Sequence, residues 1–142
     1  PISDSGITIE YLQDVAGTDR LLPLKGRDRY RALTLALLAD GIMDASILVV
    51  YENRFRPDAA THSPRWLAHQ RGKITRGLSV FEKTTPDPKK SDIVAIGLSC
   101  ALGYLDWRKQ VDWRPDYPGL VAWLNEFSRN EPAFERTRAP DA

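Results

Sequence analysis

Residues 27–55 constrain the fold of this sequence most, because they predict one helix well above the usual globular length. Arginine and aspartate dominate its first turn and a half. Its middle, residues 33–50, is apolar on nearly every face. A helix that is apolar all round must be covered on several sides. We therefore expect a central helix with other helices packed around it.

The composition fits one ordinary globular domain of 142 residues, with 42% hydrophobic and 27% charged residues. Lys and Arg total 20 and Asp and Glu total 19, so the formal net charge is +1. A chain with so little net charge lacks the field that attracts nucleic acid or an anionic membrane. We expect neither partner, and a helix-turn-helix DNA-binding protein is a weak interpretation.

Cysteine and histidine are scarce, since Cys100 is the one cysteine and His62 and His69 are the only histidines. This excludes an internal disulfide framework and leaves too few ligands for a Cys/His zinc site, so no metal is expected. We expect no apolar run to reach the ~18 residues of a membrane span, and we identify no basic-then-apolar leader at the start of the chain. These features predict a soluble, cytoplasmic protein.

Four further helices follow from caps and periodicity. Residues 5–17 begin at the cap candidates Asp4 and Ser5, and Ser63-Pro64 begins an amphipathic helix. Asp92 caps the most regular helix, and Tyr117 opens the last long one. No stretch alternates with period two, so we expect an all-α fold of about five to six helices with no sheet.

The helix after Asp92 carries an apolar stripe that includes Gly97, Cys100 and Tyr104. Cys100 lies in mid-helix with no histidine near it in sequence. A cysteine in this setting is usually buried and inert. We therefore interpret Cys100 as a structural residue rather than a nucleophile.

Read in order, five motifs resemble the C-terminal part of the glutathione transferases, over essentially the whole chain. The motifs are PISDSGITIEYL (1–12), LLP (21–23), ADGIMDA (39–45), DIVA (92–95) with CALGYLD (100–106), and YPGLVAW (117–123) with NEPAF (130–134). Each motif alone is weak, but their shared order is specific. The resemblance implies a helical bundle of the glutathione transferase C-terminal type.

The resemblance also implies two domains. Residues 1–22 would be the last helix and linker of a truncated thioredoxin-like domain, and residues 23–142 the all-helical domain. The rest of a thioredoxin-like unit would add on the order of 50–60 residues upstream. One position departs from the family pattern, because Ala95 stands where an Asp usually completes a capping box. We expect Asp92 to satisfy a single backbone donor there.

Asp4 and Ser5 are the best candidate site, because a helix N-terminus presents free N–H groups and partial positive charge to an anion. The resemblance implies that Ser5 holds the γ-glutamyl carboxylate of glutathione and that Asp4 takes its α-ammonium group. The simpler interpretation is that Ser5 is only an N-cap. The two are compatible, since the cap geometry creates the carboxylate site.

The resemblance places the catalytic group, a Ser, Cys or Tyr that activates the glutathione thiol, in the thioredoxin-like domain, so none is expected in this chain. A substrate pocket would lie against one face of the long helix. Asp44, Leu48, Tyr51 and Phe55 share that face at i, i+4, i+7 and i+11, and Tyr51 offers a hydroxyl. Plain packing explains these four residues at least as well.

Two classes of function remain open. The first is a glutathione transferase that conjugates or reduces small hydrophobic electrophiles, with glutathione as co-substrate, and this chain would be inactive alone. The alternative is a non-catalytic binding or assembly module of the same architecture. The resemblance further implies a homodimer formed through the charged helix start, residues 27–31, which is otherwise a solvated surface.

Overall fold

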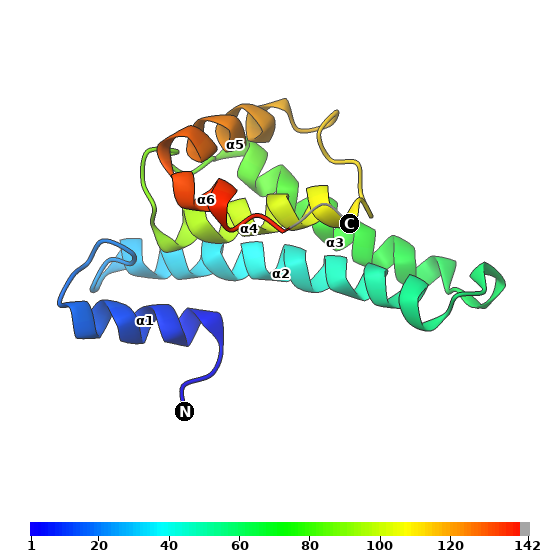
Figure 1. Cartoon of the computed structure of the whole chain (residues 1–142), viewed down its shortest axis with the longest axis horizontal. Helices are drawn as coiled ribbons and strands as arrows, with labels where there is room; N and C mark the ends of the chain where they lie inside the picture. The colour runs from blue at the N-terminus through cyan, green and yellow to red at the C-terminus, as the bar shows by residue number, and fades with distance from the viewer. Residues whose placement is uncertain (140–142) are drawn as a thin grey trace.

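Helix α2 (Arg27–Phe55) is the axis of the fold, and α3 (Pro64–Lys83) and α4 (Ile93–Arg108) pack along it (Figure 1). The structure is a computed structural model that describes residues 1–139. Its other helices are α1 (Ser5–Ala16), α5 (Pro118–Asn130), α6 (Pro132–Arg136) and the single 3₁₀ turn η1 (Ala59–Thr61). No strand occurs within residues 1–139, and the predicted all-α fold is confirmed.

The inner face of α2 is made of small and branched apolar residues, with Ala39, Ile42, Ala45 and Val49 all buried. Helix α2 is also long and apolar enough to cross a membrane by length and composition alone. The expectation that no apolar stretch reaches that length is therefore wrong. Here α2 packs against α3 and α4. Core helices of soluble proteins can have the same length and apolar composition.

The N-terminus of α4 is better satisfied than the sequence predicts. The Asp92 carboxylate accepts hydrogen bonds from the Val94 and Ala95 N–H groups, both at 3.0 Å. The Ile93 N–H donates to the Leu21 carbonyl at 2.9 Å. The expectation of a single satisfied donor is wrong, because one carboxylate oxygen spans two amides and the linker supplies another acceptor.

Helix α5 begins against a carboxylate of α3. The Gly119 and Leu120 N–H groups donate to the two oxygens of Glu82, each at 2.8 Å. This negative charge also complements the positive end of the α5 dipole. After α5, Phe134 of α6 packs back on Phe127, with ring centroids 6.1 Å apart. The short α6 thereby closes the bundle beside α4.

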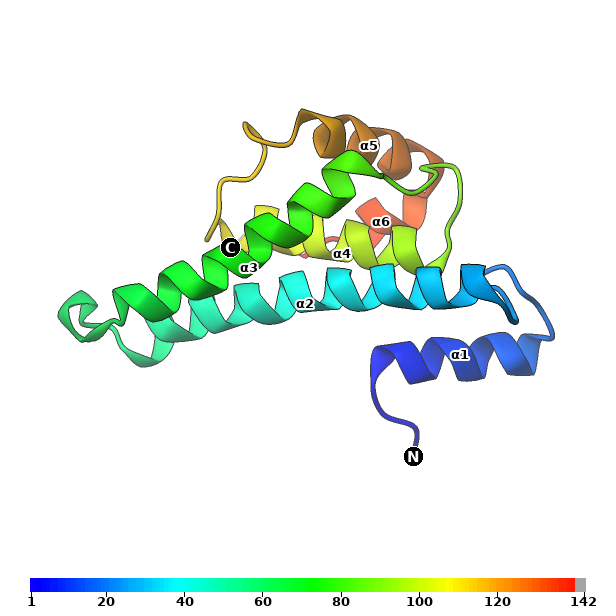
Figure 2. The same ribbon diagram turned by 180° about the vertical axis from the view of Figure 1, so that it is seen from behind.

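Helix α1 lies on the side of α2 away from α5 and α6 and runs antiparallel to α2 (Figures 1 and 2). Only Gln13 of this helix is buried, and its outer residues Ile7, Tyr11, Leu12 and Val15 are exposed. The Gln13 amide contacts the linker through three hydrogen bonds of 2.6–3.1 Å. One polar side chain therefore fixes how α1 and the linker meet.

An ion pair adds a second connection between α1 and α2. The Arg29 guanidinium contacts the Glu10 carboxylate and also donates to the Pro23 carbonyl at 3.2 Å. Arg29 belongs to the charged helix start, residues 27–31. It is not simply solvated, because its charge is paired with Glu10 within the chain.

Candidate functional site

The N-terminus of α1 carries a strained cap. Asp4 is the N-cap with φ 76°, and its Oδ1 accepts the Gly6 N–H at 2.8 Å. A non-glycine residue in this backbone region costs on the order of 1–3 kcal/mol, and such strain is concentrated at functional sites. Ser5 is the first helical residue and is exposed. The cap is therefore Asp4, and the Ser5 hydroxyl is not needed for capping.

A cavity of about 440 Å³, which we call cavity A, opens in front of this cap. Three helices form its walls, and they bring together segments far apart in the sequence. Its lining includes the N-cap Asp4 and Ser5 of α1, Asp40 and Asp44 of α2, and Gly97 and Cys100 of α4. At Gly97 an added Cβ would lie 3.4 Å from Ala39, so glycine lets α4 approach α2 closely here.

Cavity A presents opposite charges to a ligand. The free N–H groups of α1 favour an anion. Asp4, Asp40 and Asp44 bring three carboxylates to the same space, which favours a cation. Desolvation raises the pKa of Asp40, and the negative charges of Asp4 and Asp44 raise it further. This combination suits a zwitterion, such as the amino-acid end of a peptide.

Asp4, Ser5 and Asp44, all predicted from the sequence, meet at cavity A. Leu48, Tyr51 and Phe55 lie further along α2 and are not among the residues that line it. Tyr51 and Phe55 are exposed and contact each other, with ring centroids 5.2 Å apart. Of the four residues predicted for the substrate face, Asp44 alone therefore lines cavity A.

Cys100 is exposed, and the interpretation of a buried residue is wrong. Its side chain faces the space between α2 and α4 rather than the core, which Leu98, Ala101 and Leu102 of α4 form. Desolvation by the cavity walls raises the pKa of the Cys100 thiol. Cys100 therefore holds its proton at neutral pH and is a weak nucleophile, as expected from the sequence.

A second space of about 590 Å³, cavity B, continues along α4. Tyr104 and Trp107 of α4 and Phe134 of α6 form aromatic walls, and Arg138 lies at the edge. The Arg108 guanidinium stacks over Trp107, 3.4 Å from the ring centroid. Sequence analysis missed cavity B, although Cys100, Tyr104 and Trp107 follow one another at helical spacing.

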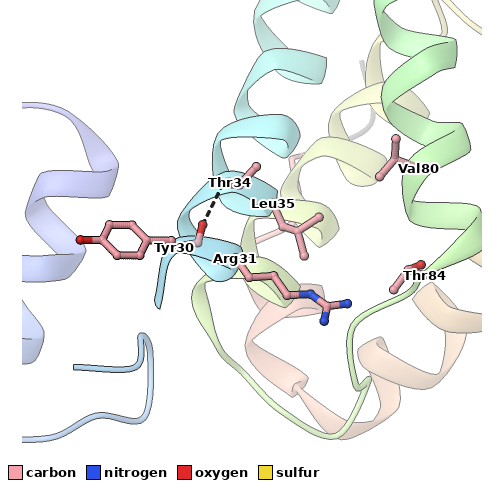
Figure 3. Close-up of a pocket in the computed structure, with 6 residues that line it drawn as sticks. All are labelled: Tyr30, Arg31, Thr34, Leu35, Val80 and Thr84. Atoms are coloured by element: carbon pink, nitrogen blue, oxygen red, sulfur yellow. Dashed lines mark hydrogen bonds between the residues drawn. The ribbon is translucent and has the colours of Figure 1, made fainter. Parts of the chain in front are cut away.

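A third depression lies on the outer surface, between the start of α2 and the end of α3 (Figure 3). Leu35 and Val80 form its apolar floor. Arg31 extends toward Thr84, whereas Tyr30 points away from Val80 and is exposed. This groove shares no lining residue with cavities A and B and contains part of the charged helix start. No cluster of three or more metal-binding side chains is found within residues 1–139.

Known proteins with related sequences carry the same fold. The uncharacterized GST-like protein YibF of Escherichia coli (strain K12) is 39% identical over 145 residues, which covers 98% of this chain and 70% of YibF. No protein-family profile matches the chain.

Among solved structures, a glutathione transferase family member from Pseudomonas fluorescens Pf-5 is 44% identical with a TM-score of 0.89. The similarity covers 98% of this chain and 71% of that chain, which has bound S-(propanoic acid)-glutathione. The Pseudomonas protein is also known with bound glutathione. A glutathione S-transferase from Methylobacterium radiotolerans, in complex with glutathione sulfonate, is 29% identical with a TM-score of 0.85, over 99% of this chain and 68% of that one.

Proposed function

Because this chain belongs to the glutathione transferase family, we propose that the protein binds glutathione in cavity A and conjugates it through its sulfur to a small electrophile. The observation that carries the proposal is the strained Asp4 cap, which opens onto a cavity with both anion-binding and cation-binding groups. Relatives at 44% and 29% identity that hold glutathione or its derivatives support the same ligand.

In this proposal the γ-glutamyl end of glutathione lies against α1. The Ser5 hydroxyl and the N–H groups of the first turn donate hydrogen bonds to its carboxylate. The free oxygen of Asp4 and the Asp40 carboxylate attract its ammonium group. Asp44 lines the opposite wall, towards the electrophile, and Leu48, Tyr51 and Phe55 would extend that wall along α2.

The reaction we propose is a nucleophilic attack by the glutathione sulfur. The thiol loses its proton, sulfur forms a bond to an electrophilic carbon, and the proton ends on the leaving group or on the adjacent carbon. We assign thiol activation to a thioredoxin-like domain, to which residues 1–22 would contribute the last helix and linker. The alternative, a non-catalytic module of the same architecture, would bind glutathione without turnover.

We predict that Ser5→Ala weakens glutathione binding about tenfold, because one hydrogen bond to a charged group is lost. Isothermal titration calorimetry with reduced glutathione measures this change. Ser128→Ala is the matched control, since the Ser128 hydroxyl donates to Glu135 at 3.2 Å and Ser128 does not line cavity A. Equal affinities for wild type and Ser5→Ala would exclude the α1 terminus as the carboxylate site.

Glutathione binding should also depend on pH through Asp40. Its pKa is raised in the folded protein, so Asp40 becomes neutral at a higher pH than an ordinary aspartate, and its attraction for the ammonium group is then lost. The same raised pKa means that Asp40 stabilises the fold only at low pH, and this contribution is lost as pH rises through the folded pKa.

We therefore expect wild-type affinity to fall in acid more steeply than that of Asp40→Asn. The measurement is glutathione affinity as a function of pH for the two proteins. Asp40→Asn should also raise the free energy of unfolding at neutral pH, because it removes a desolvated charge repelled by Asp4 and Asp44. If the glutathione affinities of the two proteins change with pH in the same way, Asp40 does not bind the ammonium group.

We further propose a cytoplasmic homodimer that does not bind membranes. The exposed apolar groups Tyr30 of α2 and Val80 of α3 support a protein contact on the face that they share. The groove of Figure 3 lies within it. Arg29 would remain outside the contact, since Glu10 of the same chain binds its charge.

A further inference from the structure

Charge is distributed unevenly along this chain. Residues 54–76, which we call the basic arm, contain six of the 20 Lys and Arg residues but only one of the 19 Asp and Glu residues. The rest of the chain holds the other 14 basic and 18 acidic residues. Because the field around a protein follows the local arrangement of its charges, the basic arm can attract an anion although the whole chain is nearly neutral.

The basic arm projects from the fold. It comprises the end of α2, the η1 turn and the first half of α3, and this hairpin extends past α4, α5 and α6 in both views (Figures 1 and 2). Helix α5 is bonded to the later turns of α3, where the Tyr117 hydroxyl donates to the Thr75 carbonyl at 3.0 Å and Glu82 accepts the first amides of α5. The first half of α3 therefore keeps its outer face in solvent.

The cations of the basic arm are exposed and mostly unpaired. They are Arg54, Arg56, Arg65, Arg71, Lys73 and Arg76. Arg56 alone forms an ion pair within residues 1–139, with Glu52 of α2. The one acid of the arm, Asp58, caps η1. Lys73 and Arg76 lie one turn apart on α3, where like charges repel. The arm thus carries positive charge that the chain itself does not neutralise.

An exposed tryptophan lies among these cations. The Trp66 side chain is 43% exposed, and its ring stacks on His69 with centroids 6.1 Å apart and an interplanar angle of 28°. Protein interfaces are enriched in tryptophan and arginine and depleted in lysine. Five of the six cations of the arm are arginines. The composition of the basic arm is therefore that of a protein-binding surface.

The size of the basic arm favours a short anionic partner. The cations from Arg65 to Arg76 span about 16 Å of helix, since each residue adds about 1.5 Å. A nucleic acid strand carries negative charge along its whole length, so it would run from the arm onto the acidic remainder of the chain and be repelled there. A second copy that presented the same arm would bring like charges together. An acidic segment of a different protein meets neither obstacle.

We propose that the basic arm docks an acidic segment of another protein, whose carboxylates pair with the exposed arginines and whose apolar side chain packs on Trp66. Arginine suits this role because its guanidinium binds a carboxylate through two parallel hydrogen bonds. No residue of the arm lines cavity A, so this surface adds a protein partner to the proposed function and does not depend on it. Added salt should weaken the contact, because exposed charges are screened.

The probe for this surface is a fluorescein-labelled, glutamate-rich peptide with one central leucine, and fluorescence anisotropy measures its binding. We expect the triple variant Arg65→Gln/Arg71→Gln/Arg76→Gln to bind about tenfold more weakly than wild type, as the loss of three exposed charge pairs predicts. The matched control, Lys25→Gln/Lys89→Gln/Lys90→Gln, removes the same charge from exposed positions outside the arm and should bind like wild type. Equal urea midpoints for the two triple variants show that both are folded.

Trp66→Ala tests the apolar part of the contact. This variant should lose the preference of wild type for the leucine peptide over the same peptide with alanine in place of leucine. If the arm variant and the control variant lose the same affinity, net charge alone attracts the peptide and the inference is overturned.

Other occupants of the basic arm give different results. If an oligothymidylate strand or phosphatidylserine vesicles bind wild type more tightly than the peptide, through the same three arginines, the partner is a nucleic acid or a membrane and the inference is overturned. If the arm variant changes the sedimentation of the protein alone, the arm contacts a second copy, which also overturns it. The inference fails as well if wild type does not bind the peptide at low salt.

Discussion

Replacing Gln13 with alanine is expected to lower the free energy of unfolding by about 3 kcal/mol. The Gln13 Oε1 accepts the Leu21 and Leu22 N–H groups at 3.1 and 2.6 Å, and its Nε2 donates to the Leu22 carbonyl at 2.7 Å. Gln13 and Leu22 are buried, so water does not readily replace the lost partner. The substitution leaves three backbone groups unsatisfied and a void beside the linker.

Urea denaturation measures this loss, and amide hydrogen exchange locates it. We expect faster exchange at Leu21 and Leu22 in Gln13→Ala. Asp14→Ala is the matched control, because Asp14 is the next residue of α1, is exposed, and its side chain makes no hydrogen bond within residues 1–139. If both variants unfold at the same urea concentration and protect these amides equally, Gln13 does not hold the linker.

The second large effect concerns the contact between α2 and α3. A Cβ added at Gly77 would lie 2.6 Å from Ile42 Cγ1 and 2.9 Å from its Cδ1, closer than real side chains approach. Ile42 is fully buried and cannot move aside into solvent. Gly77→Ala should therefore destabilise the protein by about 2 kcal/mol through overpacking, despite the better helix propensity of alanine.

The control for this prediction has the opposite sign. A Cβ at Gly41, in the middle of α2, would meet nothing within 4 Å. Gly41→Ala should raise the free energy of unfolding by up to about 1 kcal/mol, because only the propensity gain applies. Thermal or urea unfolding of the two variants measures both changes. If Gly77→Ala instead stabilises the protein, α2 and α3 can move apart to accommodate the added methyl group with little loss of free energy.

The sequence was informative about single helices. The Asp92 and Ser63 caps, the glycine stop after α1 and the apolar stripes predict element boundaries closely, since each is a local property of a few residues. The same logic failed for Cys100. An apolar stripe identifies a helix face, but it does not say whether the face meets another helix or a cavity.

The sequence could predict only part of the candidate site. Asp4 and Ser5 stand next to a helix start, which is itself a local signal, and the i, i+4 spacing of Asp40 and Asp44 places both on one face of α2. Nothing in the chain order links Asp4 to Gly97 or to Cys100. Their meeting at cavity A depends on how α1 and α4 cross α2.

The sequence by itself determined the all-helical fold, the ends of the long helices and the family to which the chain belongs. The helices and their ends follow from periodicity and caps, which are local properties of a few residues. The family follows from the order of the motifs along the chain. Only the tertiary structure decided that Gln13 and Glu82 satisfy backbone groups of other segments, and that Tyr104 and Trp107 are left without acceptors. Such roles depend on contacts between distant residues, and helix crossing and loop geometry set those contacts.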